Sequence, residues 1–498
     1  MKNIKRFIFP LTLVLLLAAC SRTDSVSSES KTEQKSSEAP TSSVVSSSSE
    51  AQASTSSSVV SSSVSSVVSS ETTSENQPAF DTSEPEDSDF TLINPTDTSM
   101  LSKNCKAYVD AMREQEEELM EADDPMDPYK YHDLKGTNGV NISEDKYVTN
   151  EADRVYLDKG DPNGYNQTRS QTPDRSDKNM GVDLKFESDL DLQASEYKVL
   201  VSLDKDDFSK AKECEVKQDG EGFLANAKNL FVNTKYYWKV VADDEESHVA
   251  SFETGDYPRW IDARPMYNVR DLGGYMTESG HRVKQGLVFR GGEIATRAWA
   301  SGHTVTSAES SKKAFREDMG MAGGVELELR GSGDIGDGYN SCVFAENNDI
   351  QYVQYAIKSY EQTFTNTRNL VPGIFEQLKN ADQKHVYFHC WGGADRTATV
   401  AFLLNGLLGV SYTDLVIDFE LTSYSSINNE HVRCHIPGFQ HSYDRWPALI
   451  NQLKTDTTGG YAWDDDALLM DNIENFLVKA CSVPQATINT IRDIMLED

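Results

Sequence analysis

A serine-rich tract near the amino terminus most strongly limits what this chain can fold into. Residues 41–70 alone contain 17 Ser, interleaved with Val, Thr and Ala. Such a composition buries too little apolar surface to offset the conformational entropy of an ordered chain. We therefore expect residues 20–95 to form a disordered tether, and the folded domains to follow it.

Residues 1–19 have the pattern of an export signal. A positively charged start precedes an apolar run over 7–17 that is too short to span a bilayer, and Leu-Ala-Ala leads directly to Cys20. This order resembles a bacterial lipoprotein signal, in which the cysteine becomes the lipidated first residue of the mature protein. The resemblance implies an extracytoplasmic protein held on the cell membrane by lipid at Cys20, with the tether crossing a thick, Gram-positive type of wall.

The charge balance limits the partners. The 498 residues include 47 Lys and Arg against 80 Asp and Glu, a net charge of −33. Nucleic acids and anionic lipid surfaces need a basic footprint, so neither is an expected partner and the lipid anchor is the expected membrane attachment. An anionic substrate would need a local positive pocket in a repulsive overall field.

The seven cysteines are too sparse for a disulfide scaffold. Cys20 and Cys390 have special contexts. The remaining five are expected to be buried thiols, with one or two disulfides as the alternative: Cys105, Cys214, Cys342, Cys434 and Cys481.

Residues 96–149 form an acidic, partly helical segment. Apolar residues that include Leu101, Cys105, Val109 and Met112 recur at helical spacing over 101–122. We expect this helix to pack on the domain that follows it, and no chemistry is assigned to it.

Residues 150–255 switch to the alternation of half-buried strands, as in Tyr197–Leu203 and Tyr237–Val241. The run Leu230-Phe-Val-Asn-Thr-Lys-Tyr236 resembles the tyrosine corner of fibronectin type III domains, with Val232 where Pro is usual. In that corner a Tyr hydroxyl bonds the backbone just upstream. The segment is therefore predicted to be an all-β sandwich of fibronectin III or immunoglobulin type that acts as a spacer.

Residues 256–498 alternate helical patterns with short apolar strands. The strands are expected at 287–289, 325–329, 352–353 and 386–388. This alternation is typical of an α/β domain with a mainly parallel sheet flanked by helices.

The stretch after the last of these strands carries the chemistry. Cys390 ends the strand, two glycines shape the next turn, and Arg396 stands six positions after the cysteine, before an apolar helix. A strand, a glycine-bearing loop and a helix N-terminus together direct backbone N–H groups at an anion. The helix dipole and the arginine would hold Cys390 as a thiolate.

Each neighbour has an expected role. Gly392 and Gly393 let the loop turn back on itself, and Arg396 offers a bidentate fork to two phosphate oxygens. Thr397 can hydrogen-bond the thiolate. His389 is expected to bond backbone groups that orient the loop rather than to act as a base.

His389-Cys390-x5-Arg396-Thr397 resembles the H-C-x5-R-[ST] motif of the protein tyrosine phosphatase superfamily, and its Asp-Arg-Thr ending resembles the bacterial branch. Two further segments are similar to the start of that domain: Asn268-Val-Arg-Asp-Leu-Gly-Gly-Tyr275 and Gly286-Leu-Val-Phe-Arg290. Helical patterns near 473–477 and 491–495 fit its closing helices. The resemblance covers about 240 residues.

The resemblance implies a two-step mechanism without a cofactor or a metal. Cys390 attacks phosphorus, and water hydrolyses the resulting cysteinyl-phosphate. The expected partners are phosphotyrosine proteins or small phosphomonoesters. The alternative substrates are inositol phosphates or phosphoinositides. Family members that attack phosphoinositides commonly carry Lys where this chain has Ala394, which weakens the case for highly charged lipid head groups.

The general acid that protonates the leaving oxygen is left open by the sequence. In the family it is usually an Asp about thirty residues before the nucleophile, whereas this chain has Glu361 at that spacing. Asp395 inside the loop is a second candidate, and Asp334 and Asp337 are two more. Each is otherwise a surface carboxylate, or in the case of Asp395 a structural partner of Asn268 or Arg270.

Other residues are assigned to support or contact. Asn268, Arg270 and Asp271 are expected to brace the loop more than to touch substrate. Arg290 is assigned to substrate binding, with a structural ion pair as an equal alternative. Trp391 either walls the pocket against an aryl phosphate or packs inward, and the backbone from Trp391 through Ala394 is expected to bind phosphate.

Two functions of other classes remain alternatives. A pseudophosphatase would capture phosphorylated ligands without turnover, which the intact Cys390 and Arg396 disfavour and the unassigned general acid favours. A surface adhesin would act through the β-sandwich, although that segment offers no recognition motif.

Overall fold

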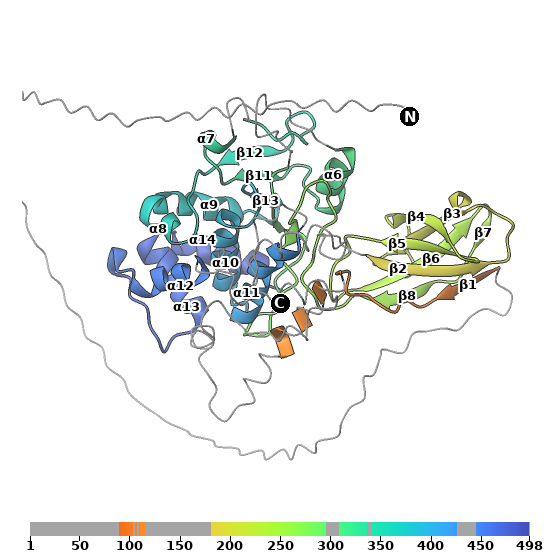
Figure 1. The fold of residues 1–498 in the computed structure, drawn as a ribbon, viewed down its shortest axis with the longest axis horizontal. Coiled ribbons are helices and arrows are strands. Elements are labelled where there is room, and N and C mark those ends of the chain that lie inside the picture. The colour runs from red at the N-terminus through yellow and green to blue at the C-terminus, as the bar shows by residue number, and fades with distance from the viewer. Residues whose placement is uncertain are drawn as a thin grey trace, which may run out of the picture. The chain divides into compact units, whose positions relative to one another are not determined.

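The residues that the structure describes comprise an antiparallel β region and a carboxy-terminal α/β region (Figure 1). The computed structural model describes residues 89–102, 105–106, 109–110, 112–114, 181–294, 308–335, 340–425 and 445–497. The predicted export signal, Cys20 and nearly all of the predicted tether lie outside these residues, as does Cys434.

The β region has eight strands, all paired antiparallel in the order β1-β2-β5-β4-β3-β6-β7, with β8 also paired to β6. The strands are β1 (Phe90–Ile93), β2 (Val182–Ser188), β3 (Tyr197–Ser202), β4 (Lys212–Asp219), β5 (Gly222–Ala227), β6 (Lys235–Ala242), β7 (Glu245–Glu246) and β8 (Ala250–Glu253).

Strand β4 joins two groups of strands. Its residues 212–215 pair with β3, and its residues 216–219 pair with β5. Buried and exposed side chains alternate along β2 and β6, and the buried ones from both groups form one core that includes Phe186 and Trp238. The predicted β region is thus confirmed, while its fibronectin III type stays a prediction.

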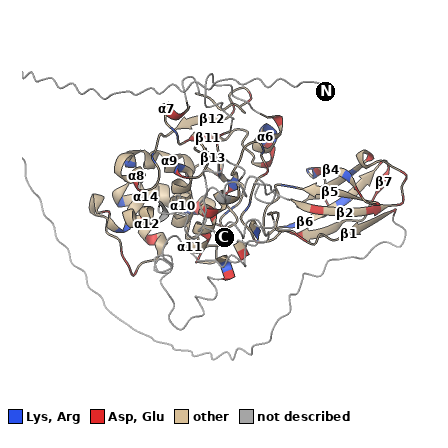
Figure 2. Cartoon of the chain, in the orientation of Figure 1, with Lys and Arg blue, Asp and Glu red and all other residues tan. Residues whose placement is uncertain are grey.

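Residues of both charge signs occur along these strands (Figure 2). Lys185 pairs with Asp219, and Lys198 pairs with Glu213, all four well exposed. Exposed pairs of this kind contribute little to stability, so the core and the strand ladder hold this region together.

The expected corner bond is present before β6. The backbone N–H of Phe231 donates to the hydroxyl of Tyr236 at 2.8 Å. Tyr236 is itself buried, so the bond fixes the 230–235 loop against the core. This loop presents its outer backbone groups to the α/β region.

The β region begins earlier than the sequence indicated. Residues 90–93 fall within the predicted tether, yet they form β1 and pair with β2 from Phe90 opposite Ser188. Phe90 is buried in the shared core. The low-complexity composition ends before this short apolar segment, so the tether cannot extend to residue 95.

The helical turns predicted after residue 101 are present at the described residues 105–106, 109–110 and 112–114. Leu101, Cys105, Val109 and Met112 pack into the main core of the α/β region rather than onto the β region that follows in sequence. Arg113 also donates to Asp414 at 3.1 Å. Leu101, Cys105, Val109 and Met112 therefore belong to the α/β core, although they precede strands β2 to β8 in the sequence.

The α/β region contains a five-stranded sheet in the order β12-β11-β13-β10-β9. Among the described strands, β10 to β13 run parallel to one another, and β9 pairs antiparallel with β10. Its strands are β9 (Arg270–Asp271), β10 (Val288–Gly291), β11 (Val325–Glu328), β12 (Gln351–Gln354) and β13 (Val386–His389). The predicted mainly parallel sheet is confirmed.

Helices cover the sheet and close the domain (Figure 1). They are α6 (Glu309–Lys313), the π-helical η3 (Ala314–Asp318), α7 (Ser332–Ile335), α8 (Glu361–Asn366), η4 (Arg368–Leu370), α9 (Val371–Leu378), α10 (Arg396–Leu408), α11 (Tyr412–Glu420), η5 (Leu421–Tyr424), α12 (Arg445–Thr455), η6 (Thr458–Gly460), α13 (Leu469–Asn475), the π-helical η7 (Phe476–Ala480) and α14 (Gln485–Met495).

The two faces of the sheet bury different cores. Val386 and Phe388 of β13 join the large core that includes α9, α10, α13 and α14. Tyr387, which points to the opposite face, joins a smaller core with Phe289 of β10 and Phe315 of η3. Because alternate side chains of a strand face opposite ways, the single strand β13 is anchored on both sides and places Cys390 firmly at its end.

The described cysteines other than Cys390 are Cys105, Cys214, Cys342 and Cys481, and all four are buried free thiols. This confirms the first expectation for these residues. Among the helices that the structure describes, none has the length and apolarity needed to cross a bilayer.

Arg259 joins the corner loop of the β region to the α/β region. Its buried guanidinium donates to the carbonyls of Leu230 and Asn229, both at 2.9 Å, and to the carboxylate of Asp271 at 2.6 Å. It also stacks on the ring of Phe231, with 4.2 Å to the ring centroid. Nearby, the side-chain amide of Gln285 accepts a hydrogen bond from the N–H of Val232 and donates one to the carbonyl of Val232. The β region is thus fixed to the α/β region by buried, directional bonds.

We predict that Arg259→Met lowers stability by about 3 kcal/mol or more, because it removes the charged partner of the buried Asp271 carboxylate and the side-chain donor to two backbone carbonyls. Urea unfolding followed by tryptophan fluorescence measures the change. Lys198→Met is the matched control, since its ion pair with Glu213 is exposed and its midpoint should not move. Equal midpoints for the two variants would contradict the role given to Arg259.

Candidate active site

Cys390 lies at the carboxyl end of β13, between the carboxyl ends of β10 and β11. The chain then makes a five-residue loop, 391–395, and α10 begins at Arg396. Open α/β sheets bind ligands at this edge, where the loops after parallel strands meet. The local sequence produces this geometry because the apolar strand stops at His389 and the apolar helix starts only after the two glycines.

The carbonyls of the loop are held by donors outside it. The Trp391 carbonyl accepts from the Tyr267 hydroxyl and the Glu293 N–H, and the Gly392 carbonyl accepts from Asn268 at 3.0 Å. Arg290 donates to the Gly393 carbonyl at 2.5 Å. In a planar trans peptide the N–H points opposite to the C=O. The N–H groups of residues 392–394 therefore point to the inner side of the loop, where an anion would sit.

Gly393 is required by this loop for two reasons. Its φ is +66°, a backbone conformation that residues with a Cβ rarely adopt. A Cβ at this position would also lie 2.5 Å from the backbone of Gly291. The loop thus packs directly against the end of β10.

Two buried arginines support the loop through one carboxylate. Asp418 of α11 pairs with Arg290 and with Arg270, which also donates to the side chain of Asn268. Both guanidinium groups hold the pKa of Asp418 below its usual value although burial opposes this. Asn268 therefore contacts the loop directly, and Arg270 contacts it through Asn268.

Arg290 does not have the role assigned to it from the sequence. It is fully buried, and its guanidinium is committed to Asp418 and to the Gly393 carbonyl. A substrate at the open side of the loop cannot reach it. The assignment to substrate binding is therefore wrong, and the alternative of a structural ion pair holds.

Asp271 braces a turn next to the loop rather than the loop itself. Its carboxylate accepts from the N–H groups of Gly273 and Gly286 and from Arg259. The turn carries β9 into the sheet, and β9 contains Arg270. Asp271 thus supports the site through the backbone.

The environment of Cys390 favours a thiolate. Burial raises the pKa of the thiol, but the Arg396 guanidinium and the hydroxyl and N–H of Thr397 lower it, and the net pKa lies below the ordinary value. The other described cysteines have the opposite shift. Burial raises the pKa of Cys214 to about 11, raises those of Cys105 and Cys481 to about 12, and raises that of Cys342 further.

The carboxylates proposed as general acid lie in different contexts. Asp334 of α7 accepts from Arg396 at 2.5 Å and is half-exposed. Asp395 accepts from the Tyr360 hydroxyl at 2.7 Å. Glu361 follows Tyr360 at the start of α8. Asp337 lies outside the described residues. Among the described candidates, Asp334 pairs with Arg396.

The remaining loop residues fit their predicted places. Trp391 is half-buried at the rim, whereas Gly392 and Ala394 are buried and offer backbone to the site. The Nδ1 atom of His389 lies 3.2 Å from the Cys390 carbonyl, which agrees with an orienting role.

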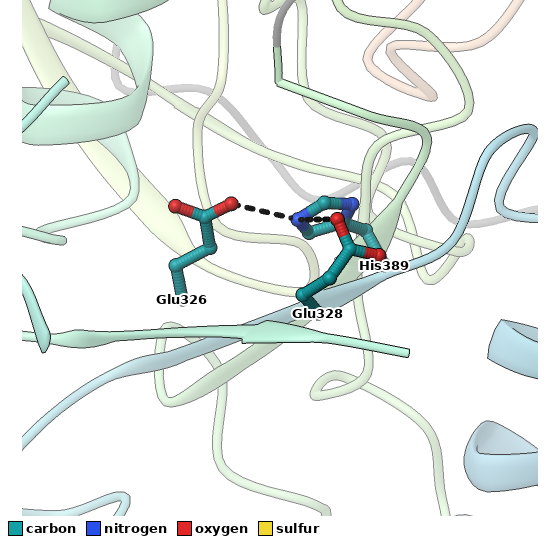
Figure 3. A group of neighbouring side chains, drawn as sticks. All are labelled: Glu326, Glu328 and His389. Atoms are coloured by element: carbon teal, nitrogen blue, oxygen red, sulfur yellow. Dashed lines mark hydrogen bonds and ion pairs between the residues drawn. The ribbon is translucent and has the colours of Figure 1, made fainter. Parts of the chain in front are cut away.

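His389 also has partners that the sequence analysis did not identify. Its Nε2 lies 2.9 Å from Glu326, and Glu328 is the next nearest carboxylate (Figure 3). The ligand-type atoms of these three residues lie within 4.8 Å of one another, a spacing that also suits a metal ion. Arg330, however, donates two side-chain bonds to Glu328, so the cluster already contains its own cation.

The sequence analysis does not identify several other residues of the site, although some of them carry a recognisable signal. Asp418 was visible as an acidic residue within the apolar run of α11, and Glu326 and Glu328 as charges alternating with apolar residues in β11. A charge in an otherwise buried pattern signals a buried partner. Tyr267 and Tyr360 gave no such signal, because tyrosine is common at half-buried positions.

Residues 261–308 and 340–497 match the model of the tyrosine phosphatase family. Among curated proteins, none matches the chain closely enough to count as a relative. The family match covers less than half of the chain but includes the loop from Cys390 to Arg396. It supports a tyrosine phosphatase-family protein with a phosphatase function. Strand β11 and helix α7 lie between the two matched segments.

We predict that Gly393→Ala abolishes phosphate binding and activity while the fold is retained, because the loop must move away from β10 to place the new Cβ. Protection of Cys390 from alkylation by inorganic phosphate measures the binding. Gly331→Ala is the control, since a Cβ there makes only an ordinary contact, 3.5 Å from Ala356. Normal protection in Gly393→Ala would contradict the proposed geometry of the loop.

We also predict selective alkylation of Cys390 at mildly acidic pH. Its lowered pKa keeps a reactive thiolate at a pH where an ordinary thiol, with a pKa of about 8.5, is protonated. Iodoacetate at about pH 6 should therefore label Cys390 and spare Cys105, Cys214, Cys342 and Cys481, as read by peptide mass mapping. Equal labelling of Cys390 and Cys214 would show that Cys390 is not activated.

Proposed function

We propose that the protein is a cysteine-dependent phosphomonoester hydrolase whose most suitable substrates are phosphotyrosine proteins. The observation that carries the proposal is a Cys390 thiol of lowered pKa inside a loop whose carbonyls are bonded outward. Such a site offers a nucleophile, inward N–H groups and the guanidinium of Arg396 to one phosphoryl group.

The chemistry proceeds in two displacements. The Cys390 sulfur forms a bond to phosphorus as the ester oxygen leaves with a proton from the general acid. Water then attacks the cysteinyl-phosphate, gives its proton to the same carboxylate, and releases phosphate and the thiolate. Arg396 and the loop N–H groups stabilise the equatorial oxygens in both steps. The Thr397 hydroxyl stabilises the departing thiolate.

We infer that Asp334 is the general acid. Its carboxylate occupies one N–H of Arg396, and the rest of that guanidinium can still bind phosphate. The carboxyl group would then lie beside the ester oxygen. Asp395 is the second candidate, because it lies in the loop but is held by Tyr360.

Substrate choice follows from the charge around the site. Ala394 supplies no cation, and Asp334 adds a negative charge at the rim. These features favour a substrate with one phosphate over highly phosphorylated inositols. Half-buried Trp391 offers an aromatic surface for an aryl ester. The alternatives remain an inositol phosphate or phosphoinositide phosphatase, and a phosphate-binding protein without turnover.

The deciding experiment is a phosphatase panel on the full mature chain with phosphotyrosine peptide, phosphoserine peptide, inositol phosphates and phosphoinositide vesicles. We expect phosphotyrosine peptide to give the highest kcat/KM, with inhibition by vanadate and none by EDTA. Turnover restored by a divalent metal after chelation would overturn the cysteine mechanism. Phosphate binding without turnover on any substrate would favour the pseudophosphatase alternative.

The identity of the acid can be tested by leaving-group dependence. Asp334→Asn should lower kcat/KM for alkyl phosphates by about 100-fold or more and for activated aryl phosphates much less, because a phenolate leaves without full protonation. Glu361→Gln and Asp395→Asn are compared on the same substrates, and exposed Asp382→Asn, near the opposite end of β13, is the control. If Asp334→Asn only lowers KM, its carboxylate merely competes with phosphate for Arg396.

We further propose that lipid at Cys20 holds the enzyme on the outer face of the cell membrane. The support is the export signal and the Leu-Ala-Ala-Cys20 order. Cys20→Ala should release the protein from the membrane fraction or stall its processing, as read by fractionation and mass spectrometry. An unchanged membrane fraction for the variant would exclude this anchor.

A further inference from the structure

A buried cluster of charged side chains lies behind the nucleophile on one face of the sheet. Glu326 and Glu328 project from β11, and His389 projects from the neighbouring strand β13 toward them (Figure 3). All three are fully buried. They face away from the large core that Val325 and Leu327 join, because alternate residues of a strand face opposite ways.

Both ring nitrogens of His389 face oxygen acceptors. Nε2 lies 2.9 Å from Glu326, and Nδ1 lies 3.2 Å from the Cys390 carbonyl. A carbonyl oxygen and an ionised carboxylate can only accept, so both nitrogens must carry a proton for both bonds to form. The geometry therefore suits the imidazolium ion rather than either neutral tautomer.

The charges around the ring favour the same state. Arg330 pairs with Glu328 at 2.7 Å and with Glu293 at 2.6 Å. The Cys342 thiol faces Glu326, and the Tyr387 ring stacks on the imidazole with 5.3 Å between centroids. Three buried carboxylates thus lie in this cluster, Glu293 and Glu328 against Arg330 and Glu326 against His389, and a charged His389 supplies a second positive charge. Burial of excess negative charge would be costly without it.

We propose that Glu326 is a positioning residue for the nucleophile: it holds His389 as the imidazolium, whose Nδ1–H keeps the Cys390 carbonyl turned away from the phosphate site. The proposal rests on the function proposed for Cys390. Because the carbonyl is turned away, the N–H of Trp391 points to the inner side of the loop and extends the row formed by residues 392–394. The imidazolium also places a positive charge one residue from the thiolate.

Two observations support this assignment. Burial lowers the pKa of His389, but Glu328 and Glu326 raise it more, so the net pKa lies above the ordinary value. Glu326 also lies outside both segments that match the family model, in the strand between them. It is therefore a feature of this chain that the family match does not itself supply.

The first test measures the charge state of His389 in the unmodified protein. NMR of full-length protein labelled at the histidine rings follows each ring with pH, and the His389 signal is assigned by its loss in His389→Gln. We expect its midpoint above the ordinary histidine pKa of about 6.5. His385, at the other end of β13 against the Met319 carbonyl, is an internal reference. A neutral His389 ring at pH 6 would overturn the proposal.

The second test removes the charge of Glu326 and keeps its shape. Glu326→Gln should lower the His389 midpoint and raise the pH at which iodoacetate attacks Cys390. If the pKa of Cys390 rises by about one, alkylation well below that pKa slows about tenfold. Glu317→Gln, an exposed carboxylate on η3, is the matched control and should change neither profile.

The outcomes separate this proposal from the proposed function. Unchanged His389 and Cys390 profiles in Glu326→Gln would overturn the role of Glu326 even if the enzyme is an active phosphatase. Shifted profiles would support it even if no substrate is turned over, because neither readout needs catalysis. Should Glu326→Gln fail to fold, a neutral His389 ring at pH 6 in the unmodified protein would still overturn the proposal.

Discussion

The loop after β13 can bind an anion only while its carbonyl oxygens are bonded on its outer side. Those bonds come from segments far apart in sequence: the side chains of Tyr267, Asn268 and Arg290, the N–H of Glu293, and the ring of His389. None of these groups needs to touch substrate. Each instead turns a peptide plane, so that preorganised N–H groups face the phosphoryl group without reorganisation during the reaction. Asp418 pairs with Arg290, which bonds the loop directly, and with Arg270, which bonds Asn268.

Buried polar contacts also connect the β region to the loop after β13. Its corner loop is fixed internally by Tyr236 and externally by Arg259, which also binds Asp271. Asp271 and Arg270 form β9, and Arg270 holds both Asn268 and Asp418. A continuous set of buried polar contacts therefore runs from the β region to the phosphate loop. Buried networks of this kind are stable only when every member keeps its partner.

Because the chain is strongly acidic, an anion can be attracted only by groups close to the site. A net charge of −33 repels phosphorylated substrates at long range, but salt screens exposed charges beyond about 10 Å. Inside the site the N–H groups, the helix terminus and Arg396 act at short range and in a partly dry environment, where each counts for more. Arg396 already binds Asp334, so a phosphoryl group must share that guanidinium with a carboxylate.

Local patterns in the sequence determined the β and α/β regions, the parallel sheet and the order of strand, Cys390, glycines and Arg396, because periodicity and a contiguous motif are properties of neighbouring residues. They also predicted that Asn268 and Arg270 brace the loop. They could not decide the role of Arg290, place Phe90–Ile93 in the β region, or reveal that the helix after Leu101 packs on the α/β core. Nor could they pair Glu326 with His389, which are 63 residues apart, or Asp334 with Arg396. Those pairings depend on which strands become neighbours and in which register, and only the packing of the whole sheet fixes that.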